Sequence, residues 1–137
     1  MKVAIVGAGV IGSKRAASLS DDDDLVMVCD SNESVGRKLS EKYDTHFTND
    51  YRQVARNSDI DVVFISVINK YAAPIAIEML KPAKHVLCEK PLGRNCKESH
   101  QILEAAGKSR KILKTGFNHR FHSSIMKVKK LMDDNAI

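Results

Sequence analysis

Short apolar runs alternate with longer amphipathic stretches along almost the whole chain. Six runs are expected to be strands, at residues 3–6, 25–29, 45–47, 61–65, 85–88 and 112–116. The stretches between them have helical spacing, at about 10–20, 33–43, 50–56, 71–80 and 95–107, with a last helix from 123 or 124. Strands that alternate with helices are typical of right-handed parallel crossovers, so the pattern predicts an α/β fold.

The first apolar run ends in the pattern G-x-G-x-x-G, formed by Gly7, Ala8, Gly9, Val10, Ile11 and Gly12. Gly7 would permit the tight turn out of the strand, and Gly9 would let a pyrophosphate approach the backbone. Gly12 would let the following helix pack closely, and that helix would offer N–H groups to phosphates. The alternative is that three glycines simply make a turn. The position between a strand and a helix favours a dinucleotide site.

This unit also predicts the strand order. If the first half of the chain is a standard mononucleotide-binding unit, the fold is a Rossmann-type, doubly wound, mostly parallel six-stranded sheet of order 3-2-1-4-5-6. The ligand would lie across the carboxyl ends of the strands, where the order reverses between strands one and four. No internal repeat or long linker interrupts the pattern, so we expect one dinucleotide-binding domain over residues 1–137.

Local signals add detail to the helices. Ser31 or Asn32, Asn49 and Asn95 are expected to be caps, because their side chains can accept a hydrogen bond from the first helical turn. Pro74 is expected only in the first turn of the helix at 71–80. The apolar residues of the last helix, Ile125, Val128 and Met132, share one face and are interpreted as core or interface.

Asp30 closes the second apolar run, 18 residues after Gly12. In the dinucleotide interpretation it accepts hydrogen bonds from the adenosine ribose hydroxyls. Its charge would repel the extra phosphate of NADP, and the neighbouring Ser31 carries no compensating positive charge. The predicted cofactor is therefore NAD, with NADP less favoured. The alternative is an Asp that serves only a turn or a helix cap.

Polar residues also follow strands four and five. The backbone around Ser66, Val67 and Asn69 should pass beside the phosphates and the nicotinamide ribose, although polar loop caps would explain the same residues. Glu89, Lys90 and Pro91 follow the fifth strand at the mouth of the predicted crevice. Lys90 is the candidate catalytic residue, since a lysine there can stabilise negative charge and relay a proton. Without other information, a solvated turn would be the better explanation of this lysine.

Composition narrows the function classes. Hydrophobic residues make up 43% of the chain and no run of eighteen apolar residues occurs, so we expect a globular protein without a membrane span. The net charge of +5 is spread over helices without a nucleic-acid motif, which favours a basic surface for anionic ligands over nucleic-acid binding. Cys29, Cys88 and Cys96 have no C-x-x-C spacing and are interpreted as reduced thiols of a cytoplasmic protein, with no metal site.

The glycine loop, Asp30 and the phrases KHVLCEKPL (84–92) and GFNHRF (116–121) together resemble the Gfo/Idh/MocA oxidoreductases. The resemblance covers essentially all of residues 1–137 and implies an NAD(P)-binding Rossmann domain. It implies that Lys90 lies near the nicotinamide and the reacting oxygen, with Glu89 by the nicotinamide ribose. Asn118 and Arg120 would approach the cofactor from strand six. The chain departs from the family at Ile68, at Ala83, where the family has glycine, and after the Arg-Phe pair.

The resemblance also implies an activity for the complete protein, namely hydride transfer to or from a sugar, cyclitol or sugar nucleotide. Family members continue into a second domain that supplies most substrate contacts and the interface of a homo-oligomer. Residues 1–137 correspond only to the first domain of the family, so we expect the second domain to be absent and expect no turnover from these residues alone. The competing interpretations are a stand-alone dinucleotide-binding or redox-sensing module and an inactive truncated fragment. The identity of the substrate does not follow from these residues.

Overall fold

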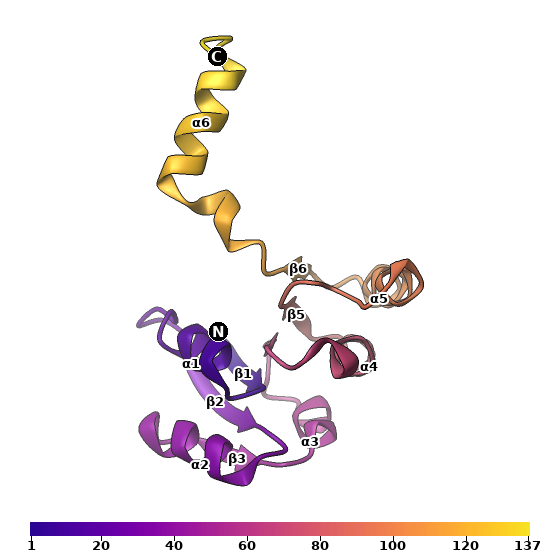
Figure 1. The fold of residues 1–137 in the computed structure, drawn as a ribbon. Helices are drawn as coiled ribbons and strands as arrows, with labels where there is room; N and C mark the ends of the chain where they lie inside the picture. The colour runs from indigo at the N-terminus through magenta and orange to yellow at the C-terminus, as the bar shows by residue number, and fades with distance from the viewer.

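The computed structural model describes residues 1–137 and contains a six-stranded sheet of order β3-β2-β1-β4-β5-β6 (Figure 1). All five neighbouring pairs are parallel, so the predicted Rossmann-type fold and strand order are confirmed. The strands are β1 (Lys2–Val6), β2 (Asp24–Cys29), β3 (His46–Thr48), β4 (Val62–Ile65), β5 (His85–Cys88) and β6 (Leu113–Thr115).

Helices cover both faces of the sheet. The elements are α1 (Val10–Ala16), α2 (Glu33–Lys42), α3 (Tyr51–Arg56), α4 (Asn69–Leu80), α5 (Cys96–Ser109), a 3₁₀ turn η1 (Asn118–Phe121) and α6 (Ser123–Asp133). One buried cluster joins the sheet to α3, α4 and α5, and a second cluster on the other face joins it to α1 and α2. Successive residues of β1 alternate between the clusters, with Val6 in the first and Ile5 in the second. This two-sided burial explains why the central strands are apolar throughout.

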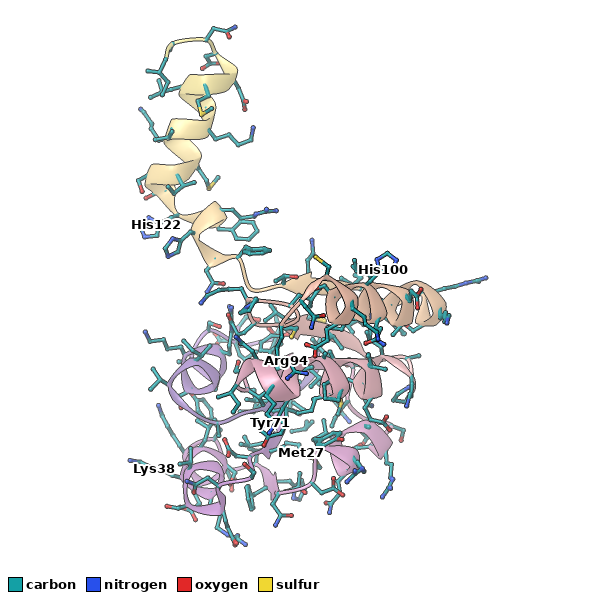
Figure 2. All side chains as sticks on the ribbon, turned by 45° about the vertical axis from the view of Figure 1, so that its right-hand side comes forward. Met27, Lys38, Tyr71, Arg94, His100 and His122 are labelled. Carbon is teal, nitrogen blue, oxygen red and sulfur yellow. The ribbon has the colours of Figure 1, made fainter.

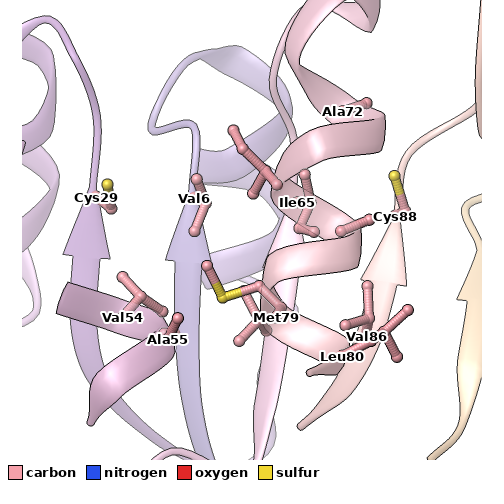
Figure 3. Packing of buried hydrophobic residues seen from close by; sticks show 14 of the residues in the cluster. Val6, Cys29, Val54, Ala55, Ile65, Ala72, Met79, Leu80, Val86 and Cys88 are labelled. Carbon is pink, nitrogen blue, oxygen red and sulfur yellow. The ribbon is translucent and has the colours of Figure 1, made fainter. Parts of the chain in front are cut away.

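Two of the three cysteines end strands inside the larger cluster. Cys29 and Cys88 are buried at the carboxyl ends of β2 and β5, on either side of Val6 (Figure 3). Burial raises the pKa of the Cys29 thiol to about 12 and that of the Cys88 thiol to about 11. Cys96, at the start of α5, is exposed. All three are free thiols, as the absence of paired spacing predicts.

Two helix boundaries differ from the predictions for local reasons. The first helix was expected to reach about residue 20 but ends at Ala16, where the Ser18 hydroxyl donates to the Arg15 carbonyl and competes with the helical bond. The predicted cap Asn49 is also wrong. Asp50 caps α3 instead, because its carboxylate accepts from the Arg52 N–H at 3.0 Å. The caps Asn32 and Asn95 are confirmed.

Pro74 lies inside α4 rather than in its first turn, because the helix begins at Asn69. Proline removes a donor at that point, so the Lys70 carbonyl loses its usual helical partner. Pro74 and Lys70 are both exposed, which leaves this carbonyl on the side of the helix that water reaches. The opposite side carries the buried residues Ala73, Ile75 and Met79. The expectation for Pro74 was therefore wrong.

The turn between α4 and β5 has a conformation in which glycine is favoured. Ala83 has a φ of 61°, in the left-handed region, at the position where the sequence departs from the resembled family. The next residue, Lys84, is only 3% exposed, and its ammonium donates to the carbonyl oxygens of Asn57 and Ile60 at 2.5 and 3.0 Å. Desolvation lowers the pKa of Lys84, with the nearby Asp61 acting in the opposite direction. This lysine therefore joins β5 to the turn before β4.

The last helix projects away from the sheet (Figures 1 and 2). None of its residues is buried, and Ile125, Val128 and Met132 are 48%, 45% and 61% exposed. They are therefore not part of the core of this chain, which was one of the two interpretations of their spacing. No helix of the structure combines the length and the apolar character needed to cross a membrane.

We expect residues 1–137 to self-associate in solution, because α6 exposes an apolar face next to the exposed Phe117 and Phe121. Light scattering at rising protein concentration measures this directly, and a Val128→Lys variant should shift the distribution toward monomer. A chain that stays monomeric at high concentration would show that this face has no affinity for itself.

Candidate functional site

The glycine loop joins β1 to α1 at the carboxyl edge of the sheet. Gly7 has a φ of 96°, and a Cβ at this position would lie 2.5 Å from the carbonyl oxygen of Ser66. A Cβ on Gly12 would lie 1.9 Å from the carbonyl oxygen of Gly7. Both positions therefore exclude a side chain because the loop is packed against backbone. At Gly12 the close neighbour is the loop itself, with the strand residue Ile5 next at 3.3 Å.

Gly9 differs from these two glycines. A Cβ built on it meets nothing within 4 Å, and its φ of −63° is open to any residue. Gly9 caps α1 without a side-chain hydrogen bond, and the first intrahelical bond runs from the Ser13 N–H to the Gly9 carbonyl. The N–H groups of Val10, Ile11 and Gly12 precede that bond. The fold thus leaves space and unused donors where an anionic group can bind.

Asp30 is fixed beside this loop by backbone donors. Its Oδ2 accepts from the Ala8 N–H at 2.7 Å, and its Oδ1 accepts from the Asn32 N–H at 2.8 Å. The carboxylate therefore serves the turn, as one interpretation expects, and also ties β2 to the glycine loop. Each carboxylate oxygen can accept a second hydrogen bond. Asp30 thus keeps the capacity to bind hydroxyl groups from the cleft that it lines.

An open cleft of about 650 Å³ follows the carboxyl ends of β1, β2 and β4. It brings together six of the residues that the sequence singles out, namely Gly7, Gly9, Asp30, Ser31, Ser66 and Val67. The Ser66 hydroxyl is buried and has no hydrogen-bond partner within the protein. Buried hydroxyls without a partner are rare in folded proteins, so this one is a candidate for a contact with a ligand or an ordered water. Asn69 begins α4 and lies outside this lining.

Sequence reasoning missed part of the cleft wall. The β3–α3 connection and the first turn of α3 contribute Asn49, Asp50, Tyr51 and Arg52. Ile68, which caps α4, and Tyr71 and Ile75 in that helix complete this part of the wall. Tyr51 and Tyr71 are aromatic, and the Arg52 guanidinium lies 5.2 Å from the Tyr51 ring. The available signal was position alone, since both segments follow strands at the same sheet edge. Their residue types carry no motif.

A second group of polar side chains lies at the carboxyl ends of β5 and β6. Glu89 follows β5, and its carboxylate accepts from two nitrogens of Arg15 on α1, including Nε at 2.8 Å. Nη2 of Arg15 also donates to Oδ1 of Asn118, at 2.8 Å. A Cβ on Gly116 would lie 2.6 Å from Oε2 of Glu89, so the carboxylate lies directly over that glycine. Glu89 and Asn118 are thus brought together, through an arginine that the sequence motifs did not single out.

The remaining predicted residues are exposed around this group. Lys90 and Pro91 follow Glu89 and are both exposed. Arg120 lies in η1, where its guanidinium stands 5.7 Å from the Phe117 ring rather than in the cleft wall. Lys90 therefore has its ammonium free at the edge of the sheet beyond Glu89.

These features fit a dinucleotide. The open space over Gly9 and the unused N–H groups of α1 suit a pyrophosphate, Asp30 suits a ribose, and the orphaned Ser66 hydroxyl suits a further polar group of the ligand. Neither Gly7 nor Gly12 could be replaced without changing the loop that presents these groups. The structure contains no group of three or more His, Cys, Asp or Glu side chains that could hold a metal ion.

Comparison with known proteins supports the same interpretation. The model of the Gfo/Idh/MocA family, described as an oxidoreductase family with an NAD-binding Rossmann fold, matches residues 1–117. The inositol 2-dehydrogenase of Salmonella typhimurium is 30% identical over 143 residues, which cover all of this chain and 43% of that protein.

Two solved structures are similar in fold. A probable dehydrogenase from Thermotoga maritima has a TM-score of 0.94 and 28% identity, covering all of this chain and 42% of that one. GenD2 from gentamicin A biosynthesis, in complex with NAD, has a TM-score of 0.92 and 26% identity, covering 96% of this chain and 38% of that one. The chain thus spans less than half the length of the relatives that it matches.

Proposed function

Because this chain belongs to the Gfo/Idh/MocA family of NAD-binding oxidoreductases, we propose that it binds NAD in the cleft beside Asp30 and forms the cofactor-binding part of a dehydrogenase. The proposed reaction of the whole protein is hydride transfer to or from a carbon of a sugar, cyclitol or sugar nucleotide. Similarity to an inositol 2-dehydrogenase supports a cyclitol within this substrate class, and similarity to GenD2, which was solved with NAD, supports the cofactor. The observation that carries the proposal is the Asp30 carboxylate, fixed by Ala8 and Asn32 at the edge of the cleft.

Each part of the cleft has a proposed task. The N–H groups at the start of α1 bind the pyrophosphate in the space over Gly9. Asp30 accepts hydrogen bonds from the hydroxyls of the adenosine ribose. The Ser66 hydroxyl, which has no partner in the protein, completes the polar contacts along β4. When bound, NAD supplies the nicotinamide ring that accepts or returns the hydride.

Lys90 is the proposed catalytic residue. It follows Glu89 at the carboxyl edge of the sheet, and its side chain is exposed rather than paired in an ion pair of the chain. Its ammonium can donate to the reacting hydroxyl or carbonyl oxygen, stabilise the negative charge that develops there, and relay the proton. Glu89, Asn118 and Arg120 are proposed to line the nicotinamide half of the cofactor.

The substrate and assembly of the whole protein are also proposals. We expect residues 1–137 alone to bind the cofactor without turnover, with a further domain supplying substrate contacts and the interface of a homo-oligomer. A dinucleotide-binding module without turnover is the competing function. Assays of the full-length protein with cyclitols, sugars and nucleotide sugars separate the two, because only an enzyme reduces NAD in them.

Binding selectivity tests the cofactor site. The chain is expected to bind NAD roughly tenfold or more tightly than NADP, because the Asp30 carboxylate would face the extra phosphate. An Asp30→Ala variant should narrow this ratio, since it removes both the hydroxyl acceptor and the repulsive charge. Absolute affinities for both cofactors should also fall, because Asp30 holds the Ala8 N–H of the glycine loop. Isothermal titration calorimetry measures the ratio of NAD affinity to NADP affinity in the unmodified chain and in the variant.

Asp59→Ala is the matched control. It removes the same charge from an exposed aspartate that pairs with Lys2, away from the residues that line the cleft. Its ratio of NAD to NADP affinity should equal that of the unmodified chain. Equal affinities for the two cofactors in the unmodified chain, or a preference for NADP, would refute the assignment of Asp30.

A further inference from the structure

Arg15 connects three segments that are far apart in the sequence. It lies on α1 shortly after the glycine loop, and its guanidinium contacts Glu89 after β5 and Asn118 after β6. The Arg15 and Glu89 side chains are only 17% and 13% exposed. The other ion pairs of the chain have at least one partner with much greater exposure, such as Arg37 and Glu33 at 56% and 58%. The Arg15–Glu89 pair is therefore the most shielded of them.

The pair leaves one carboxylate oxygen of Glu89 available. Both Arg15 nitrogens that reach the carboxylate donate to Oε1. Oε2 accepts no hydrogen bond within the chain and lies over Gly116, where a Cβ would come within 2.6 Å of it. Arginine can hold such an arrangement because its planar guanidinium carries five donors in fixed directions. The hydrogen bonds from Arg15 thus hold Oε1 in place, and they thereby fix the orientation of the carboxylate and the position of Oε2.

We propose that Arg15 is a positioning residue that fixes Glu89 and Asn118 for the nicotinamide riboside half of the cofactor, an inference that rests on the proposed NAD site. Arg15 links the helix that receives the pyrophosphate to the two loops that would receive the second ribose. It thereby sets the spacing between the two halves of the binding site before the cofactor arrives. An acceptor held in place costs less conformational entropy on binding than a mobile glutamate.

The inference predicts a loss confined to one half of the ligand. ADP carries the adenosine and both phosphates but lacks the nicotinamide riboside, so it reports on the glycine loop and Asp30 alone. Arg15→Met is expected to weaken NAD binding about tenfold or more, because it leaves Glu89 and Asn118 unheld. ADP affinity should change less than about threefold, since the contacts that ADP makes lie elsewhere. Calorimetry with both probes measures the two changes.

Further variants test whether Arg15 affects NAD binding by holding Glu89 in place. Arg15→Lys keeps the charge but loses the planar set of donors, so its NAD affinity should lie between those of the unmodified chain and of Arg15→Met. Gly116→Ala keeps every charge but pushes a methyl group against Oε2, and should reproduce the selective loss of NAD binding. Combining Arg15→Met with Glu89→Gln should cost less than the sum of the two single changes, because both act through one interaction. Arg37→Met, which breaks the exposed pair with Glu33, is the matched control and should change neither affinity.

The outcomes are distinguishable. If the unmodified chain binds neither NAD nor ADP, the proposed function itself is wrong. If it binds both and Arg15→Met weakens them equally, Arg15 acts on the phosphates or on the fold, and the positioning role is overturned. An Arg15→Met chain that binds NAD normally also overturns it. Thermal unfolding of each variant shows whether an equal loss comes from destabilisation.

Discussion

A Gly9→Val chain is expected to lose NAD binding while it keeps its fold. Nothing lies within 4 Å of the position that a Cβ on Gly9 would occupy, and the φ of −63° suits a side chain. The Cβ of the valine would therefore meet no neighbour, and the side chain would occupy the space proposed for the pyrophosphate. Calorimetry should show no NAD binding at concentrations that saturate the unmodified chain, and the thermal midpoint should be nearly unchanged.

Two other glycines provide the comparison. Gly107 in α5 also has nothing within 4 Å of its Cβ position but lies away from the cleft, so Gly107→Val should bind NAD normally. Gly12→Ala should instead destabilise the fold by more than about 2 kcal/mol, because its methyl group would lie 1.9 Å from the Gly7 carbonyl oxygen. If Gly9→Val bound NAD normally, the glycine loop would be a turn and no more.

Lys90→Ala in the full-length protein is expected to lower kcat by ~10²–10⁴-fold if Lys90 stabilises charge and relays the proton. Cofactor affinity should change much less, because the proposed adenosine and pyrophosphate contacts lie at Asp30 and the glycine loop. Lys90 is exposed after β5, so its removal should leave the thermal midpoint almost unchanged. Steady-state turnover and NAD affinity, measured in parallel, separate the chemical step from binding.

The conservative variant and a control sharpen this test. Lys90→Arg should not restore turnover, because the guanidinium is bulkier and does not readily give up a proton. Lys97→Ala removes an exposed lysine from α5 and should leave kcat unchanged. Near-normal kcat in Lys90→Ala would show that Lys90 is a solvated turn residue, and the catalytic assignment would then be withdrawn.

The fold follows from the sequence because its central strands are buried on both faces. Val3–Val6 and the run before Ser66 are apolar without alternation, which is typical of parallel strands under two helical layers. The glycine motif then indicates the mononucleotide-binding unit and with it the strand order. The exact ends of the helices depend on which of several neighbouring residues acts as the cap. Asp50 rather than its neighbour Asn49 accepts the bond from Arg52, and both residue types are good caps, so sequence alone does not rank them.

The site was predictable where a local motif forms it. The glycine loop and Asp30 belong to one short unit, so their proximity follows from the spacing. Arg15 and Glu89 are 74 residues apart, and neither has a distinctive neighbour that marks it as a partner of the other. Their ion pair depends on β1 and β5 both ending at the same sheet edge. The Tyr71 side of the cleft was missed for the same reason, since it depends on how α4 packs.

The two buried cysteines at the strand ends allow unfolding to be measured by thiol labelling. A thiol reagent reacts with the thiolate form of cysteine. At neutral pH the raised pKa values of Cys29 and Cys88 leave almost no thiolate at these residues, and burial keeps the reagent away from them. Only the exposed Cys96 is open to the reagent in the native protein. Mass spectrometry after a brief pulse of alkylation therefore distinguishes native molecules, which gain one label, from unfolded molecules, which gain three. The stability of every variant can be read in this way without an optical probe, in a chain that contains no tryptophan.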